Sequence, residues 1–159
     1  IVAAASLHWM PWAQTLPRFA QLLSDKGYLA LVEQRSAHEP WADELTPLFA
    51  HYSLNRDFQP YSMRTVADEL QQHGLFQQVG LLETVPTNFR QPSSAWIEAL
   101  HATNGFSRDR MAPTKVVEFD SAVQAVMSRH CPDGEVSQQI HVRIIFGKPI
   151  DPASGAVAR

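Results

Sequence analysis

The sequence predicts an α/β fold, in which helices cover a mostly parallel sheet whose last strand is antiparallel. Three observations support this prediction. Segments of strand character and helix character alternate along the chain. The run 28–32 is apolar throughout, as strands covered on both faces are. Residues 140–146 instead alternate largely between apolar and polar side chains, which is typical of an antiparallel strand.

The first part of the chain contains the opening strand and its neighbour. We predict a strand at 1–7, a helix at 16–23, a strand at 28–32 and a helix at 41–53. Pro17 fits the first turn of the earlier helix, and Gly27 is placed to end it. Pro47 limits the regularity of the later one.

The second part is richer in helices. We predict a helix at 62–74, a strand at 76–85, a loop at 86–92, a helix at 94–105, a longer helix at 116–127 and a final strand at 140–146. Ser62 and Ser94 are placed to cap the first two of these helices. Gly74 is placed to end the helix that Ser62 begins.

Composition excludes several classes of protein. A chain of 159 residues is long enough for one domain with a core. The net charge is −3 and there is no basic stripe, so we expect no nucleic-acid partner. No apolar run approaches the length of a membrane span, so we expect no membrane partner. The single cysteine, Cys131, excludes an internal disulfide and indicates a reducing, cytoplasmic location.

Motifs of other enzyme classes are missing from the sequence. The seven histidines show no ligand spacing, so we expect no metal site. There is neither a Gly-x-Ser-x-Gly elbow, as in many hydrolases, nor a phosphate-binding loop of the Gly-Lys-Ser type. The acidic residues are scattered, as on a solvated surface. With these classes of site excluded, an enzyme that acts on a small molecule by another kind of chemistry remains.

One stretch of sequence is similar to a known family. The run Ala5-Ser6-Leu7-His8-Trp9-Met10, followed by residues 16–23 and 26–32, resembles S-adenosylmethionine-dependent methyltransferases with a Rossmann-like fold, of the methyltransferase type 11 kind. In that family a strand ends in small residues and an aromatic pair, and a helix and a Pro-Gly-Gly turn lead to the next strand. Asp25-Lys26-Gly27 stands here instead of Pro-Gly-Gly. The detailed match is confined to residues 3–33.

The resemblance implies that the chain is only the C-terminal part of such a domain. Residues 1–150 are then the C-terminal half of a doubly wound sheet, with a helical lid at about 86–135, and residues 151–159 a flexible tail. The opening of the chain in mid-strand, without an initiating Met, agrees with this expectation. The seven glycines never occur as Gly-x-Gly, so the family's glycine-rich cofactor motif is lacking. We therefore expect the chain alone to be inactive.

The resemblance also implies the reaction, which is transfer of a methyl group from S-adenosylmethionine to a small-molecule acceptor, with a carboxylate as one candidate. Small residues at a strand end let a ligand approach closely, so Ala5 and Ser6 are predicted to bind the cofactor. Trp9 is predicted to bind it too, because aromatic faces attract cations. His8 is the predicted catalytic base for a hydroxyl or amine acceptor, and would only orient a carboxylate.

Four residues are predicted to bind the acceptor: Trp12, Trp41, Trp96 and Arg35. The indoles would form apolar walls, and the guanidinium would anchor an acidic group. Tyr52, Phe106 and Met111 are further candidates, although each aromatic fits a core position equally well.

A different class of function also stays open. The chain can instead be a non-catalytic fragment that forms a homodimer through an exposed sheet edge, or an interaction module.

Overall fold

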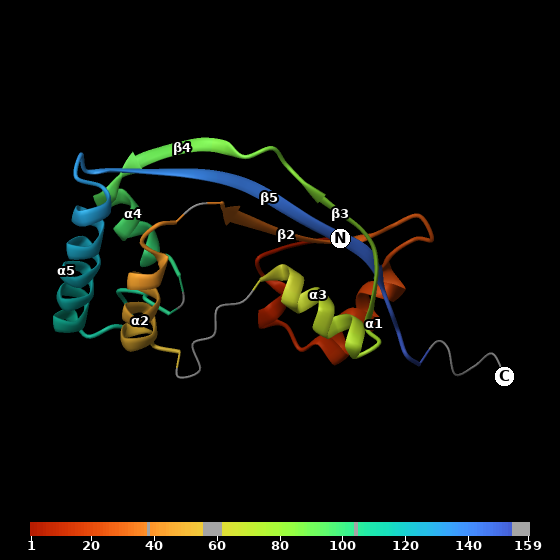
Figure 1. The fold of residues 1–159 in the computed structure, drawn as a ribbon. Coiled ribbons are helices and arrows are strands. Elements are labelled where there is room, and N and C mark those ends of the chain that lie inside the picture. The colour runs from red at the N-terminus through yellow and green to blue at the C-terminus, as the bar shows by residue number, and fades with distance from the viewer. Residues whose placement is uncertain (38, 56–61, 104, 154–159) are drawn as a thin grey trace. The chain divides into compact units, whose positions relative to one another are not determined.

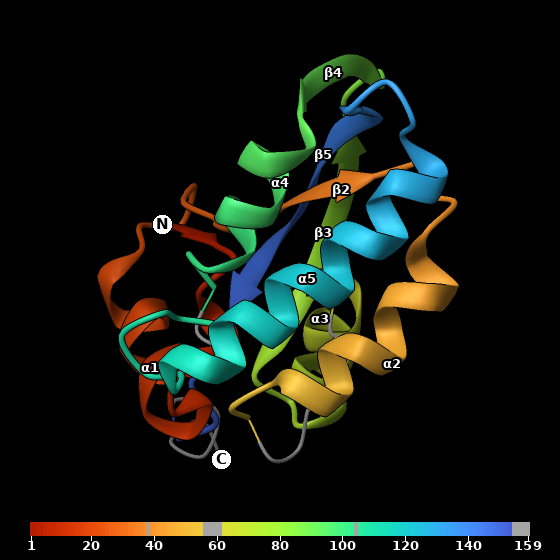
Figure 2. The same cartoon turned by 90° about the vertical axis from the view of Figure 1, so that its left-hand side faces the viewer.

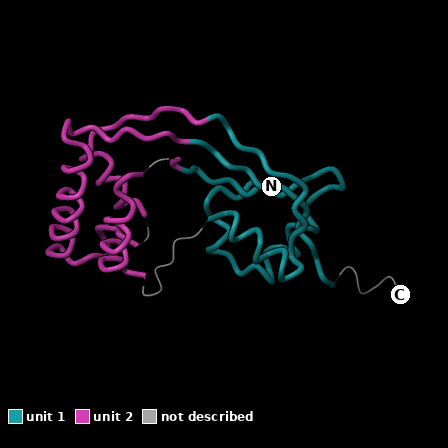
Figure 3. Tube along the Cα trace, viewed as in Figure 1, with its two compact units in different colours: residues 1–35, 60–85, 141–159 teal, residues 36–59, 86–140 magenta. Residues whose placement is uncertain are grey.

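The computed structural model describes residues 1–37, 39–55, 62–103 and 105–153. Its five strands form one sheet with the order β1-β2-β5-β3, and β4 pairs with β5 (Figure 1). The chain divides into two compact units (Figure 3). Unit 1 comprises residues 1–35, 60–85 and 141–159, and unit 2 comprises residues 36–59 and 86–140. The α/β prediction is confirmed, and each unit is described in turn.

Unit 1 holds the parallel pair of strands. Its elements are β1 (Val2–Ala4), the short 3-10 helix η1 (Leu7–Trp9), α1 (Trp12–Leu22), nearly all of β2 (Leu29–Ser36), α3 (Met63–Gln72), β3 (Phe76–Glu83) and the second part of β5 (Glu135–Pro149). β1 runs parallel to β2, with Ala4 opposite Val32, and β3 runs antiparallel to β5. The parallel opening pair and the antiparallel final strand are therefore as predicted.

The core of unit 1 lies on one face of its strands. Leu29 and Leu31 of β2 are fully buried against Leu16 of α1 and Leu70 of α3. Figure 1 shows both helices on that side of the strands. Each leucine that is fully removed from water contributes about 1.5–3 kcal/mol to the stability of the fold. Within the described residues of unit 1, no helix covers the opposite face of these strands.

Several boundaries in unit 1 differ from the sequence predictions. The opening strand ends at Ala4 rather than residue 7, and α1 begins at Trp12, so Pro17 lies inside the helix instead of in its first turn. β2 continues past Val32 to Ser36. The reason is Glu33, which is buried on the same face as Leu29 and Leu31 because an arginine of β5 lies nearby. The charged run therefore belongs to the strand and does not end it.

The helix predicted at 62–74 is confirmed as α3. The Oγ atom of Ser62 accepts a hydrogen bond of 3.1 Å from the backbone N–H of Thr65, so Ser62 caps the helix as predicted. Gly74 follows the end of the helix with a φ of +67°, a conformation that glycine adopts without steric cost.

Unit 2 is mainly helical. Its elements are α2 (Ala42–Tyr52), β4 (Thr87–Pro92), α4 (Ser93–Leu100), α5 (Pro113–His130), the first part of β5 and the last residue of β2. Figure 2 shows α5 beside α2 and α4, and both helices contact it. The predicted helices at 41–53 and 116–127 are confirmed as α2 and α5.

The segment 86–92 was predicted as a loop, and this prediction is wrong. Its residues form β4, which pairs antiparallel with the first part of β5, so that Arg90 lies opposite Ser137. β5 accordingly begins at Glu135 instead of residue 140. Most side chains of β4 are exposed, so the strand shows no apolar alternation. The next helix, α4, starts at Ser93, and its N-cap is Pro92 rather than Ser94.

The core of unit 2 is built around Phe119 of α5, which is fully buried. The ring of Phe106 stacks on it, with the ring centroids 4.9 Å apart, and the ring of Tyr52 meets it edge-on at 5.6 Å. Phe49 packs against it at 6.2 Å. Aromatic pairs in these arrangements stabilise a core beyond the area that they bury.

A buried histidine ties the end of α4 to α5. The Nδ1 atom of His101 lies 2.7 Å from the carbonyl oxygen of Phe106, and its Nε2 atom lies 2.7 Å from Oδ1 of Asp120. A carbonyl oxygen only accepts hydrogen bonds, and an ionised carboxylate only accepts them as well. Through its two ring nitrogens the side chain therefore joins the segment after α4 to Asp120 of α5.

We expect His101→Ala to destabilise unit 2 by about 1–3 kcal/mol, because Phe106 and Asp120 then lose a buried donor. Urea unfolding followed by tryptophan fluorescence measures this change. His73→Ala is the control, since His73 is exposed at the end of α3 and the change should cost under about 0.5 kcal/mol. Equal stability of the two variants would contradict the structural role of His101.

Candidate functional site

The candidate site lies at the carboxyl end of β1, where the chain leaves the sheet. Because β1 and β2 are parallel, their carboxyl ends point the same way. The backbone N–H of Ala5 still donates to the carbonyl oxygen of Val32, at 2.9 Å, and the chain then turns away into η1. In open α/β sheets, ligands bind outside the carboxyl ends of the strands.

The turn out of β1 has a strained backbone at Ala5. Its φ is +44°, and Ala5 is the one residue other than glycine with a positive φ in the described ranges. This conformation costs an alanine about 1–2 kcal/mol, and strain of this kind concentrates at functional sites. The side chain of Ala5 is exposed, and Ser6 after it is half-buried as the N-cap of η1.

His8 and Trp9 lie side by side at this turn. Their ring centroids are 4.6 Å apart with the ring planes 45° to each other. The indole of Trp9 is 61% exposed, whereas His8 is half-buried. Burial lowers the pKa of His8 below its usual value, so the ring is neutral at pH 7. A neutral imidazole can accept a proton, which is the property that the predicted base requires.

The lowered pKa of His8 predicts a dependence of stability on pH. In the unfolded chain the pKa of His8 is about 6.5, so the unfolded chain binds the proton more readily than the folded chain does. The contribution of neutral His8 to the free energy of unfolding is therefore full above about pH 6.5. It is lost as the pH falls through the lower pKa of the folded state. We expect the stability lost between about pH 7.5 and pH 5.5 to be smaller in His8→Gln than in the unchanged chain. Urea unfolding of both proteins at both pH values measures it. An equal loss in the two proteins would show that His8 is not the cause.

Trp12 and Arg35 have structural contacts in unit 1. The indole N–H of Trp12 donates to the carbonyl oxygen of Leu7 at 2.8 Å, and the ring packs against the core. The Nη1 atom of Arg35 lies 3.8 Å from Oε2 of Glu33, and the Arg35 side chain stays 41% exposed. The substrate-binding roles of Trp12 and Arg35 stay predictions.

Trp41 and Trp96 meet in unit 2. Their ring centroids are 6.0 Å apart and their planes are nearly perpendicular. Trp41 is 3% exposed and belongs to the core, where Trp96 packs partly buried against it. Both indoles thus serve packing in unit 2, and their predicted contact with a substrate stays a prediction.

Sequence reasoning missed a chain of charges on β2, β3 and β5. The Nη1 atom of Arg143 lies 3.7 Å from Oε1 of buried Glu33, and its Nε atom donates to Oε1 of Glu83 at 2.5 Å. The hydrogen bond from Arg143 lowers the pKa of the Glu83 carboxyl below its usual value. A period-two pattern through Leu29, Leu31 and Glu33 is the signal that could have shown Glu33 to face inward.

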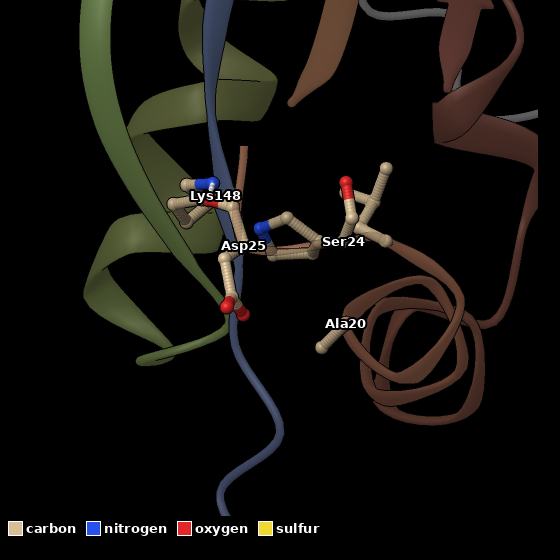
Figure 4. Close-up of a pocket in the computed structure, with 6 residues that line it drawn as sticks. Ala20, Ser24, Asp25 and Lys148 are labelled. Carbon is tan, nitrogen blue, oxygen red and sulfur yellow. Dashed lines mark hydrogen bonds between the residues drawn. The ribbon is translucent and has the colours of Figure 1, made fainter. Parts of the chain in front are cut away.

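A small pocket in unit 1 is lined by residues at the end of α1 and on β5 (Figure 4). Its lysine, Lys148, donates to the carbonyl oxygens of Asp25 and Gly27 at 2.5 and 2.6 Å. The ammonium also lies 4.5 Å from the centroid of the Tyr28 ring. These contacts hold the turn that precedes β2, so Lys148 has a structural role.

Two properties of the described residues bear on the class of site. Within the described ranges, no group of three or more His, Cys, Asp or Glu side chains is arranged to hold a metal ion. None of the helices in the described part of the chain is long and apolar enough to cross a bilayer.

Comparison with known proteins identifies the fold. No protein-family model matches the chain, and no curated protein sequence matches it at a significant level. Among solved structures, a “putative type II methyltransferase” from Anaeromyxobacter dehalogenans matches over 95% of this chain with a TM-score of 0.50 and 19% identity. The chain shares its fold with this protein. A “putative methyltransferase” from Bacillus halodurans C-125 matches over 94% of the chain, with a TM-score of 0.47 and 15% identity.

The chain is shorter than these two proteins. It covers 64% of the Anaeromyxobacter protein and 63% of the Bacillus protein. At 19% identity the likeness to the Anaeromyxobacter protein establishes the shared fold and carries no residue roles from one protein to another. The activity of the whole protein is therefore a matter for proposal.

Proposed function

We propose that the chain is the C-terminal part of a cytoplasmic methyltransferase that transfers a methyl group from S-adenosylmethionine to a small-molecule acceptor. One observation carries this proposal. In a methyltransferase fold, the strained turn at Ala5 presents a small side chain and the exposed indole of Trp9 at the carboxyl end of a parallel strand. The resemblance of residues 3–33 to such enzymes supports it independently.

The residues at the turn fit the methionine part of the cofactor. Bound S-adenosylmethionine would supply an activated methyl group on a positively charged sulfonium. The exposed face of Trp9 can attract that charge, and Ala5 leaves room for close approach because its side chain is a single methyl group. Ser6 offers a hydroxyl and a backbone amide beside them. The sequence contains no Gly-x-Gly turn, so this chain would contribute only part of the cofactor site.

The remaining residues would orient the acceptor and handle its proton. Neutral His8 can take the proton that a hydroxyl or amine acceptor releases. A carboxylate acceptor releases none, and His8 would then only orient it. We propose acceptor contacts for Trp12 and Arg35, which lie in unit 1 with His8. The acceptor contacts of Trp41 and Trp96, in unit 2, stay predictions. Positioning of this kind accounts for a large part of the rate of displacement reactions.

Titration of the ¹⁵N-labelled chain with S-adenosylmethionine tests the proposal by NMR, which detects weak binding. We expect shifts at residues 5–9, and we expect them to shrink at least several-fold in Trp9→Ala. Val117→Ala is the control, because Val117 is an exposed apolar residue of α5. Absence of shifts at residues 5–9 at millimolar cofactor, in a folded chain, would overturn the proposed cofactor site.

A second function, self-association, has its own supporting observation. Apolar side chains on the strands of unit 1 are exposed, with Val2 at 70%, Leu82 at 59% and Val79 at 53%. β1 is also the terminal strand of the sheet order, and free strand edges invite pairing with another chain. Light scattering after size-exclusion chromatography should then show a homodimer that Val2→Lys disrupts. A monomer at all concentrations would contradict this function.

A further inference from the structure

We propose that a cavity in unit 2, between the end of α2 and the start of α5, binds a small carboxylate with an apolar body. The cavity has a volume of about 340 Å³. Its lining residues are His51, Tyr52, Leu54, Met111, Ala112 and Lys115. Ligand pockets are commonly of about 300–1,000 Å³, with mainly apolar walls and a few polar groups.

The apolar walls of the cavity are held in place by the core. Met111 is 6% exposed, and its backbone N–H donates to the carbonyl oxygen of Ser107 at 3.0 Å. The ring of Tyr52 packs edge-on against buried Phe119, with the centroids 5.6 Å apart. Leu54 is half-buried, and its backbone N–H donates to the carbonyl oxygen of Gly105 at 2.9 Å. A cavity with fixed walls costs little ordering entropy when a ligand enters.

The polar groups of the cavity favour an anion. Lys115 carries a positive charge, and a ring N–H of His51 can donate a hydrogen bond. Tyr52 adds a hydroxyl donor, and its ring lies 5.7 Å from Nζ of Lys115. None of the six described residues that line the cavity is acidic. Leu54 and Met111 would contact an apolar part of the ligand. A carboxylate is the common small anion that can carry such an apolar part.

Glu118 is the competitor that such a ligand must displace. Its Oε2 atom accepts a hydrogen bond of 2.6 Å from Nζ of Lys115, and this bond raises the pKa of Lys115, which keeps the ammonium charged. Both side chains are more than half exposed. Exposed pairs of this kind are worth only about 0–1 kcal/mol, so the ammonium can exchange Glu118 for a ligand carboxylate at small cost.

Two substitutions therefore have opposite expected effects. Lys115→Met removes the cation and should weaken carboxylate binding about tenfold, which corresponds to the loss of one charge-assisted contact. Glu118→Gln frees Lys115 from its competitor and should tighten binding several-fold. Lys26→Met is the control, because Lys26 is an exposed lysine of unit 1 and its loss should leave the affinity unchanged.

The experiment is an NMR titration of the full chain with benzoate and with hexanoate, and with benzamide and hexanamide as neutral counterparts. We expect the carboxylates to shift the amide signals of Leu54, Met111, Ala112 and Lys115, and the amides to bind at least about tenfold more weakly. Binding of carboxylate and amide with equal affinity, shifts outside these residues, or weaker binding to Glu118→Gln than to the unchanged chain would each overturn the proposal. The altered residues are exposed, and signal dispersion confirms that each variant is folded.

The outcome separates this site from the proposed function. Benzoate binding does not involve methyl transfer. If benzoate shifts the cavity signals but S-adenosylmethionine does not shift those of residues 5–9, the proposed carboxylate site is supported and the proposed methyltransferase function is overturned. The reverse combination retains the methyltransferase and overturns this site.

Discussion

Phe119→Ala is expected to lower the free energy of unfolding of unit 2 by about 3–5 kcal/mol, the usual cost of truncating a buried phenylalanine to alanine. The ring is fully buried, and the rings of Phe49, Tyr52, His101 and Phe106 pack against it. Its removal opens a cavity that rigid aromatic neighbours cannot close. A loss of this size is a large part of the stability of an ordinary domain, about 5–15 kcal/mol.

Urea unfolding followed by circular dichroism measures this change. Val117→Ala is the matched control, since Val117 lies two residues earlier on α5 and is 65% exposed. We expect a change there within about 0.5 kcal/mol. Phe119→Leu should recover part of the loss. A cost for Phe119→Ala below about 1 kcal/mol would mean that the aromatic cluster does not stabilise unit 2.

Gly147→Ala is expected to destabilise unit 1 by about 3 kcal/mol or more, because the added methyl group meets backbone. A Cβ atom at position 147 would lie 2.2 Å from the carbonyl oxygen of Gln77 and 2.9 Å from its carbonyl carbon. It would also lie 2.6 Å from Cζ of Phe76. Relief requires β3 and β5 to separate where Gln78 pairs with Gly147.

Gly80→Ala is the informative comparison for this prediction. Its Cβ atom would meet two ring atoms of Phe146, at 2.5 and 2.8 Å, and no backbone atom is among its three nearest neighbours. A side chain can move where a strand cannot, so we expect a smaller loss, which Phe146→Leu should restore. Phe76→Leu should not restore Gly147→Ala, because the Gln77 carbonyl remains. Equal costs for the two glycines, measured by thermal unfolding, would refute the backbone explanation.

The sequence predicted correctly those elements that neighbouring residues determine. The unbroken apolar run before Glu33 predicted a strand with a parallel neighbour, and Ser62 predicted the start of a helix. The errors arise where a distant partner decides the structure. Glu33 stays in β2 because Arg143 lies nearby on β5, and residues 87–92 form β4 because β5 pairs with them. Neither partner is visible from the neighbouring residues in the sequence.

For the candidate sites too, residue types could be predicted from the sequence, whereas burial and distant contacts could not. The sequence predicted Trp9 for the cofactor because it follows a strand end, and Trp41 for the acceptor as an apolar wall, yet Trp9 is 61% exposed and Trp41 is 3% exposed. Residue type alone does not distinguish a surface indole from a core indole. Tyr52 and Met111 were predicted for an acceptor pocket, whereas Lys115 and His51 were not, because only the approach of α2 to α5 brings these four residues to one cavity.

The backbone at Ala5 restricts how this chain can diverge. With a φ of +44°, valine, isoleucine and threonine are disfavoured there, while glycine, asparagine and aspartate are tolerated. Homologues that keep this exit from the first strand should therefore carry alanine, glycine, asparagine or aspartate at that point, even where overall identity is too low to align them.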